Sequence, residues 1–84
     1  MNGNREGEGF RAEVQADNRH LVLLSTWSAL GWRAAIFDAS ANAEIVSEFV
    51  DNADDGMRRA EELARAIMRP LPALDWQPTP RGGV

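Results

Sequence analysis

A chain of 84 residues is long enough for one small domain. It holds 9 arginines and no lysine, 13 acidic residues and 1 histidine, for a formal net charge of −4. Because cysteine is absent, disulfides, thiolate nucleophiles and zinc–thiolate sites are excluded, and one histidine cannot build a histidine-rich metal site. No apolar run approaches the ~18 residues of a membrane span, and the start of the chain is polar. We therefore expect a soluble, cytoplasmic protein.

The first third of the chain begins with a polar segment and continues with a strand pattern. Residues 1–8 are polar and contain two glycines, so we expect them to be disordered. From Phe10 to Ala16 every second residue is apolar, which is typical of a strand with one buried face. Asn18 and Arg19 then provide a turn.

The two segments that follow are apolar on both faces. Residues 20–27 contain consecutive apolar residues, and residues 32–39 place apolar side chains at both odd and even positions. We expect two central strands that need cover on both sides, connected by a hairpin loop over 28–31. Residues 44–50 are short and β-branched and predict a fourth strand, although a helix over 42–50 fits the same apolar residues.

A helix is predicted next, with signals at both of its ends. Asn52 can cap it, and Asp54 and Asp55 lie in the first turn, where the helix dipole favours negative charge. A stripe of apolar residues continues to Met68, and Pro70 ends the helix. All 4 prolines follow within a short distance, so residues 70–84 are expected to form an extended, Pro-rich tail and not a fifth strand.

These elements predict an α+β fold. It consists of a three- or four-stranded antiparallel β-meander with one C-terminal helix packed on one face, in a single domain over residues 9–69. One helix covers only one face of the sheet, so the other face, with either Leu21 and Leu23 or Val22 and Leu24, needs the tail or a second copy of the chain as cover. Left uncovered, that face would be a docking surface. The residues expected at this face or at a dimer contact are Leu21, Leu23, Trp27, Trp32 and Trp76.

The candidates for chemistry are weak, so we expect neither an enzyme nor a cofactor. Residues 51–62 resemble an EF-hand calcium loop, but Ala53 stands at the third position and offers no oxygen ligand. His20 with Ser25 or Ser28 could be a nucleophile pair, but no third group or oxyanion loop accompanies them. The acidic residues of the predicted helix lie on its surface, where carboxylates are solvated, whereas general acid–base catalysis needs a buried group.

Negative charge is concentrated in one part of the chain. Residues 38–62 contain eight acids and two arginines, a net charge of −6. An acidic surface of this kind can be a solvated face, or it can dock onto a basic partner with carboxylates in place of phosphates. It argues against direct binding of nucleic acid. The residues assigned to this surface are Glu44, Glu48, Asp51, Asp54, Asp55, Glu61 and Glu62.

In size, acidity and expected fold, the chain resembles the small phage-encoded anti-defence proteins, including anti-CRISPR proteins, at the level of class. This resemblance implies a stoichiometric inhibitor that occupies a nucleic-acid-binding surface of a bacterial complex. The first hypothesis is therefore a non-enzymatic, homodimeric protein-binding module that uses its acidic surface. The alternative is a structural accessory or homodimeric subunit that docks through the apolar face of its sheet.

Overall fold

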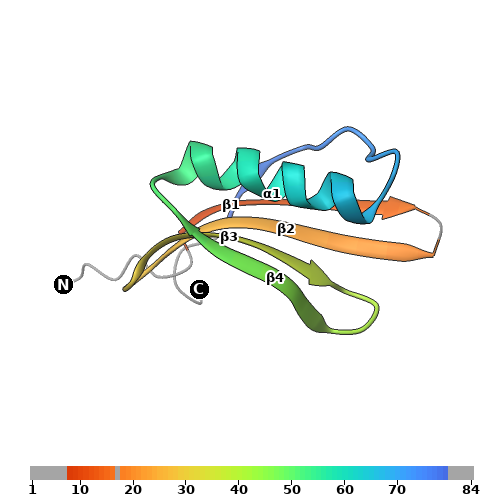
Figure 1. The fold of residues 1–84 in the computed structure, drawn as a ribbon, viewed down its shortest axis with the longest axis horizontal. Coiled ribbons are helices and arrows are strands. Elements are labelled where there is room, and N and C mark those ends of the chain that lie inside the picture. Colours follow the sequence, from red (N-terminus) through yellow and green to blue (C-terminus); the bar gives the residue numbers. More distant parts are fainter. Residues whose placement is uncertain (1–7, 17, 80–84) are drawn as a thin grey trace.

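The computed structural model describes residues 8–16 and 18–79 and has the α+β architecture that the sequence predicts. Five antiparallel strands form one sheet in the order β4-β3-β2-β1-β5, and one helix packs on it (Figure 1). The elements in chain order are β1 (Gly9–Ala16), β2 (Arg19–Ser28), β3 (Gly31–Asp38), β4 (Ala43–Val50), α1 (Ala53–Ile67) and β5 (Gln77–Pro78).

The first four strands form a meander because each connection is short and contains a residue suited to a tight turn. Asn18, between β1 and β2, has a φ of 65°, and Asn42, between β3 and β4, has a φ of 54°. Asparagine adopts this left-handed conformation more readily than most residues. Gly31 begins β3 with a φ of 125°, a value that side chains rarely tolerate.

The strand prediction for residues 44–50 is confirmed, and the helical alternative is wrong. β4 pairs with β3 along its whole length, from Trp32 opposite Val50 to Asp38 opposite Ala43. The register shifts where Ile36 lies opposite Val46 and Phe37 opposite Glu44, so the strand bulges at this point. The pairing of seven residues with β3 replaces the local hydrogen bonds that a helix would have made.

The predicted cap and helix are also confirmed. The Asn52 side chain accepts a hydrogen bond of 2.8 Å from the backbone N–H of Asp55. The buried stripe of α1 consists of three small residues, Gly56, Ala60 and Ala64. Because these side chains are short, the helix axis can lie close to β2 and β3, the two strands that it covers.

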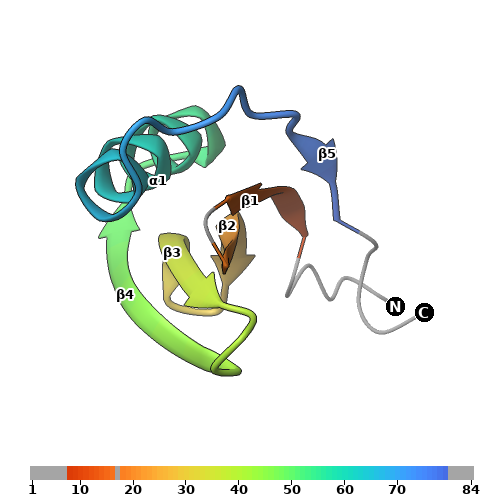
Figure 2. The same ribbon diagram turned by 90° about the vertical axis from the view of Figure 1, so that its right-hand side faces the viewer.

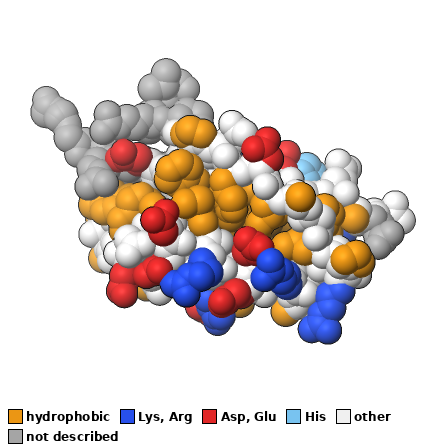
Figure 3. Space-filling model, turned by 90° about the horizontal axis from the view of Figure 1, so that it is seen from above, with side chains coloured by type: hydrophobic (Ala, Val, Ile, Leu, Met, Phe, Trp, Pro, Cys, Tyr) orange, Lys and Arg blue, Asp and Glu red, His pale blue; other side chains and the backbone are white. Residues whose placement is uncertain are grey.

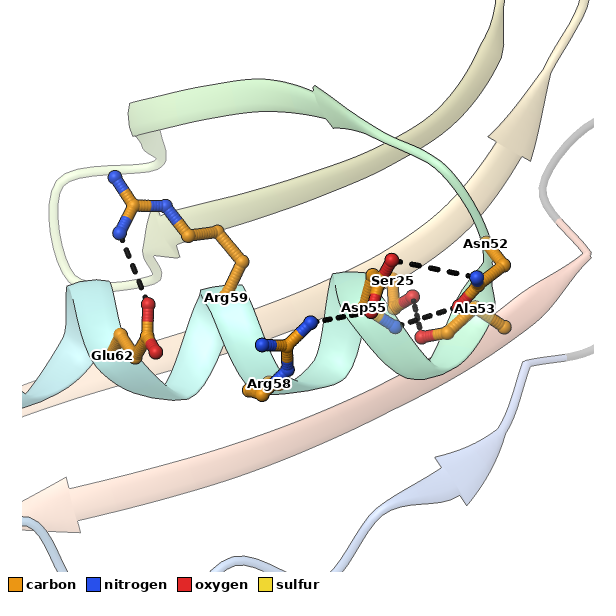
Figure 4. A network of polar contacts seen from close by, with 7 residues as sticks. All are labelled: Ser25, Asn52, Ala53, Asp55, Arg58, Arg59 and Glu62. Carbon is orange, nitrogen blue, oxygen red and sulfur yellow. Dashed lines mark hydrogen bonds and ion pairs between the residues drawn. The ribbon is translucent and has the colours of Figure 1, made fainter.

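Helix and sheet are in close contact at Ser25 of β2. Its side chain is fully buried, and its Oγ donates a hydrogen bond of 2.7 Å to the carbonyl oxygen of Ala53, in the first turn of α1 (Figure 4). A Cβ atom placed on Gly56 would lie 2.1 Å from the same Oγ. The first turn of α1 therefore needs glycine at position 56 in order to rest on the sheet.

The tail prediction needs correction over residues 71–79, because this segment is part of the fold. Leu71, Leu74 and Trp76 pack against the hydrophobic core. Gln77 and Pro78 then pair with Arg11 and Phe10 of β1 and form the short fifth strand. Residues 80–84 of the predicted tail, and residues 1–7 of the predicted disordered start, lie outside the described residues.

The core lies on one face of the sheet, and both covering elements are on that side. Its members are Ala12, Val14, Leu21, Leu23, Ala34, Ile36, Ala60, Ala64 and Met68. The helix and the tail lie side by side above the sheet in Figures 1 and 2. Within residues 8–16 and 18–79, no helix or strand covers the opposite face. We call this opposite side of the sheet the open face.

Candidate functional site

The acidic surface predicted from the sequence is partly neutralised by four arginines. Five of its seven carboxylates form ion pairs with arginine side chains. These pairs are Glu44–Arg33, Glu48–Arg59, Asp55–Arg58, Glu61–Arg65 and Glu62–Arg59. On the helix side of the molecule, acidic and basic side chains lie next to one another along one row, beside a band of hydrophobic side chains (Figure 3). This side therefore does not present a field of a single sign.

The best-formed of these pairs connects the sheet to the helix. The guanidinium of Arg59 contacts both carboxylate oxygens of Glu48, at 2.8 Å and 3.1 Å. It also donates a hydrogen bond of 3.1 Å to Glu62, one turn further along α1 (Figure 4). The hydrogen bonds from Arg59 lower the pKa of the Glu48 carboxyl, and Glu48 in turn raises the pKa of Arg59.

The Glu48–Arg59 contact predicts a pH dependence. Because the pKa of Glu48 is lower in the folded than in the unfolded chain, the contact stabilises the fold above the ordinary pKa of glutamate. The stabilisation is lost as the pH falls through the lowered pKa. A carboxyl titration by NMR should show Glu48 titrating below an ordinary glutamate, and Arg59→Gln should move its midpoint upward. Arg33→Gln, which breaks a different pair, is the control. An unchanged Glu48 midpoint in Arg59→Gln would contradict this assignment.

Two predicted acids, Asp51 and Asp54, have neither an ion pair nor a hydrogen bond from their side chains in the part of the chain that the structure describes. Asp51 lies beside a hollow of about 260 Å³ between the end of β4 and the first turns of α1. The hollow is also lined by Phe49, whose exposed fraction is 61%, and by the paired side chains of Arg58 and Arg59. Of the predicted acidic surface, this hollow is therefore the part where a basic group could still bind.

The open face has an apolar centre. In a strand, alternate side chains point to opposite faces, and Leu23 opposite Ile36 places the odd residues of β2 and the even residues of β3 under the helix. The open face therefore carries Val22 and Leu24 of β2 and Ala35 and Phe37 of β3. Val22, Leu24 and Phe37 line a shallow groove of about 330 Å³. Phe49 of β4 lies opposite Arg33 and extends this apolar area.

Charged residues of both signs lie on either side of this centre. On β1, Arg11 forms an ion pair with Glu13, and Nε2 of His20 lies 3.5 Å from the same carboxylate. Arg11 is the main cause of the lowered pKa of Glu13. On the other side, Arg33 of β3 lies 3.4 Å from Glu44 of β4. Each border of the apolar centre thus has one guanidinium and one carboxylate.

The predicted sheet-face residues need correction. Leu21 and Leu23 have exposed fractions of 0% and belong to the core under α1, so neither can contact a second chain. Trp76 packs against that same core. Trp27 and Trp32 pair with each other across β2 and β3, and the register places both on the helix side. The apolar side chains on the open face are instead the half-buried Val22, Leu24 and Phe37 and the exposed Phe49.

The turn between β1 and β2 is the signal that could have identified the correct face. A tight turn at Asn18 places Ala16 opposite Arg19, and therefore Ala12 opposite Leu23. Because β1 is apolar only on the side of Ala12, the helix must cover that side, and with it Leu23. The even residues of β2 are then left on the open face.

The candidates for chemistry do not converge. His20 lies on the open face, whereas Ser25 is buried under the helix, so the two side chains cannot form a nucleophile pair. The calcium-like stretch lies mostly within α1, where Asn52 acts as the cap. Among residues 8–16 and 18–79, no group of three or more histidine, aspartate or glutamate side chains is placed to hold a metal ion.

Two further observations complete the description of the chain. No helix in the described residues is long and apolar enough to cross a lipid bilayer. Comparison with protein-family models, with curated proteins and with solved structures finds no match to this chain, so its function has to be argued from the two surfaces described above.

Proposed function

We propose that this chain is a cytoplasmic, non-enzymatic protein-binding module that docks through the open face of its sheet. The observation that carries the proposal is the placement of both covering elements, α1 and the segment 71–76, on one side of the sheet. The central strands are apolar on both sides, so the other side keeps a partly exposed apolar centre. A partner protein that covered this centre would remove apolar surface from water, which stabilises a complex.

The charged borders support specific docking over unspecific adhesion. Arg11 and Glu13 on one border, and Arg33 and Glu44 on the other, are held in place by their own ion pairs. An apolar centre with a polar border is the common arrangement of protein–protein interfaces. The border charges would fix the orientation of the partner, and the apolar centre would supply most of the affinity.

A second candidate function uses the hollow between β4 and α1. Asp51 lines this hollow together with the exposed Phe49. Asp54 follows in the first turn of α1, and neither aspartate has a partner for its side chain among the described residues. A basic side chain of a partner could bind there, as expected for an inhibitor of the anti-CRISPR type that occupies a nucleic-acid-binding surface. The five arginine-paired carboxylates weaken this candidate, because they leave little net negative potential along the helix.

One capture experiment separates the two candidates. The full chain and three variants are immobilised and exposed to an extract of the cells that produce the protein, and the retained proteins are quantified. Leu24→Asp places a charge in the apolar centre of the open face, and the double change Asp51→Asn with Asp54→Asn removes the unpaired acids. Leu30→Asp is the matched control, since Leu30 has an exposed fraction of 83% and lies in the turn before β3.

If the open face binds the partner, Leu24→Asp reduces retention at least tenfold, since a buried leucine contributes about 1.5–3 kcal/mol, and the other variants retain what the wild type retains. Loss confined to the double asparagine variant, together with steep weakening by salt, would favour the acidic hollow. Retention that is equal for all four proteins would contradict both candidates.

A further inference from the structure

The open face is close to electrical balance on a molecule that is otherwise acidic. It carries two arginines, Arg11 and Arg33, and two glutamates, Glu13 and Glu44. Asp38 also lines its groove, so these side chains sum to a charge of −1 with His20 neutral. The whole chain has a net charge of −4, and residues 38–62 alone carry −6. A contact between two copies through a face that carries both signs of charge adds little repulsion to that of the two net charges.

The charges on this face are also arranged so that it can complement itself. Each border of the apolar centre carries both signs: Arg11 with Glu13 on β1, and Arg33 with Glu44 across β3 and β4. In a two-fold interface the same patch meets itself. Any border of one copy can lie over either border of the other copy. In each case an arginine of one chain has a glutamate of the other chain near it. A strongly basic or strongly acidic partner would instead meet like charges at both borders.

The size of the face reaches the lower threshold for a specific dimer contact. Four strands of eight to ten residues, spaced ~4.8 Å apart with a rise of ~3.3 Å per residue, give a face of roughly 500 Å². Two such faces together would bury on the order of 1,000 Å², which reaches the lower limit of specific interfaces. The main chain of β2 and β3 is central in the sheet, so the contact would rest on the most rigid part of the fold.

We infer that the occupant of the open face is a second copy of this chain, packed sheet to sheet about a two-fold axis. This inference rests on the proposed function and names the partner of that same surface. In the dimer, Val22, Leu24 and Phe37 of each copy form a shared apolar layer between the two sheets. Ala35, which has an exposed fraction of only 5%, lets the neighbouring larger side chains come together. The helices and tails lie on the two outer sides.

Light scattering coupled to size-exclusion chromatography tests the inference with the full chain. The mass of the wild type should rise with concentration from 9.3 kDa towards twice that value. Leu24→Asp should raise the dissociation constant of the dimer at least ~100-fold, because the change occurs twice per interface. Phe49→Asp changes a residue that is already 61% exposed, so the fold tolerates it, and it should also weaken the dimer. Leu30→Asp, in the exposed turn, should dimerise like the wild type.

A wild type that keeps a mass of 9.3 kDa at every concentration would overturn the second copy as occupant. Dimerisation that is equally tight in Leu24→Asp, Phe49→Asp and Leu30→Asp would overturn it as well, because the contact would then lie elsewhere. Circular dichroism of each variant establishes that the fold is kept. A monomeric wild type whose retention of a partner still depends on Leu24 leaves the proposed function standing. If the wild type is monomeric and its retention of a partner does not depend on Leu24, both the dimer and the proposed docking through the open face are contradicted.

Discussion

Gly56→Ala is expected to destabilise the protein by about 3 kcal/mol, although alanine is the better helix former. The added Cβ would lie 2.1 Å from Oγ and 2.9 Å from Cβ of Ser25. Ser25 is fully buried, and its Oγ is held by the carbonyl oxygen of Ala53, so the side chain has no free space to move into. The first turn of α1 must therefore lift from the sheet. For a domain of this size, the melting temperature should fall by at least ~12 °C.

A second-site change shows whether the collision with Ser25 is the cause. Ser25→Gly removes the two atoms that the new Cβ would strike, and the next nearest atom, Cγ2 of Val50, is at the ordinary contact distance of 3.4 Å. The double variant should therefore be more stable than Gly56→Ala alone, even though Ser25→Gly is destabilising in the wild type. Thermal unfolding of the four proteins gives the coupling between the two sites. Additive effects, or a Gly56→Ala variant as stable as the wild type, would contradict the close approach of helix and sheet.

Gly9→Ala is expected to have the second large effect, because the backbone leaves no room for a side chain. Gly9 has a φ of 151°, and a Cβ atom there would lie 2.0 Å from the carbonyl oxygen of Ser25 and 2.8 Å from Cα of Thr26. These are backbone atoms of the central strand β2, so they cannot move without breaking the sheet. The carbonyl of Gly9 also accepts a hydrogen bond of 2.9 Å from the backbone N–H of Thr79. The change should therefore loosen both the start of β1 and the β5 segment.

Gly31→Ala is the matched control for Gly9→Ala. Gly31 also has a positive φ, of 125°, but a Cβ atom there would meet nothing within 4 Å. Both variants have backbone strain, and only Gly9→Ala adds the collision, so Gly9→Ala should be less stable by about 2 kcal/mol. Amide hydrogen exchange should also show faster exchange at Thr79 in Gly9→Ala alone. Equal stability of the two alanine variants would contradict the close contact between β1 and β2.

The strands and the helix could be predicted because their signals are local. The alternation from Phe10 to Ala16, the turn at Asn18 and the cap at Asn52 each depend on neighbours in the sequence. The choice between the two faces of β2 could not be read from that strand, because Leu21, Val22, Leu23 and Leu24 are all apolar. The choice depends on which of them pairs with the apolar side of β1, and the register decides that.

The pairing of the acidic surface is not contained in the sequence pattern for a related reason. A count of charges gives −6 for residues 38–62, which includes Arg58 and Arg59 but leaves out Arg33 and Arg65, the partners of Glu44 and Glu61. Glu44 pairs with Arg33 of the neighbouring strand, and Glu48 pairs with Arg59 of the helix. The tail was misjudged as well, since the pairing of Pro78 with Phe10 joins residues far apart in the sequence. All three are contacts between elements, which a local pattern does not contain.

The most direct test of the whole account is the solvent accessibility of the open face as a function of protein concentration. A soluble paramagnetic agent broadens the NMR signals of side chains that water can reach. In dilute solution the account predicts broadened methyl signals for Val22 and Leu24 and protected ones for Leu21 and Leu23, which lie under the helix. In concentrated solution Val22 and Leu24 should become protected too. Protection of Val22 and Leu24 in dilute solution would contradict the open face of the single chain. Broadening of their signals at every concentration would contradict the covering of this face by a second copy.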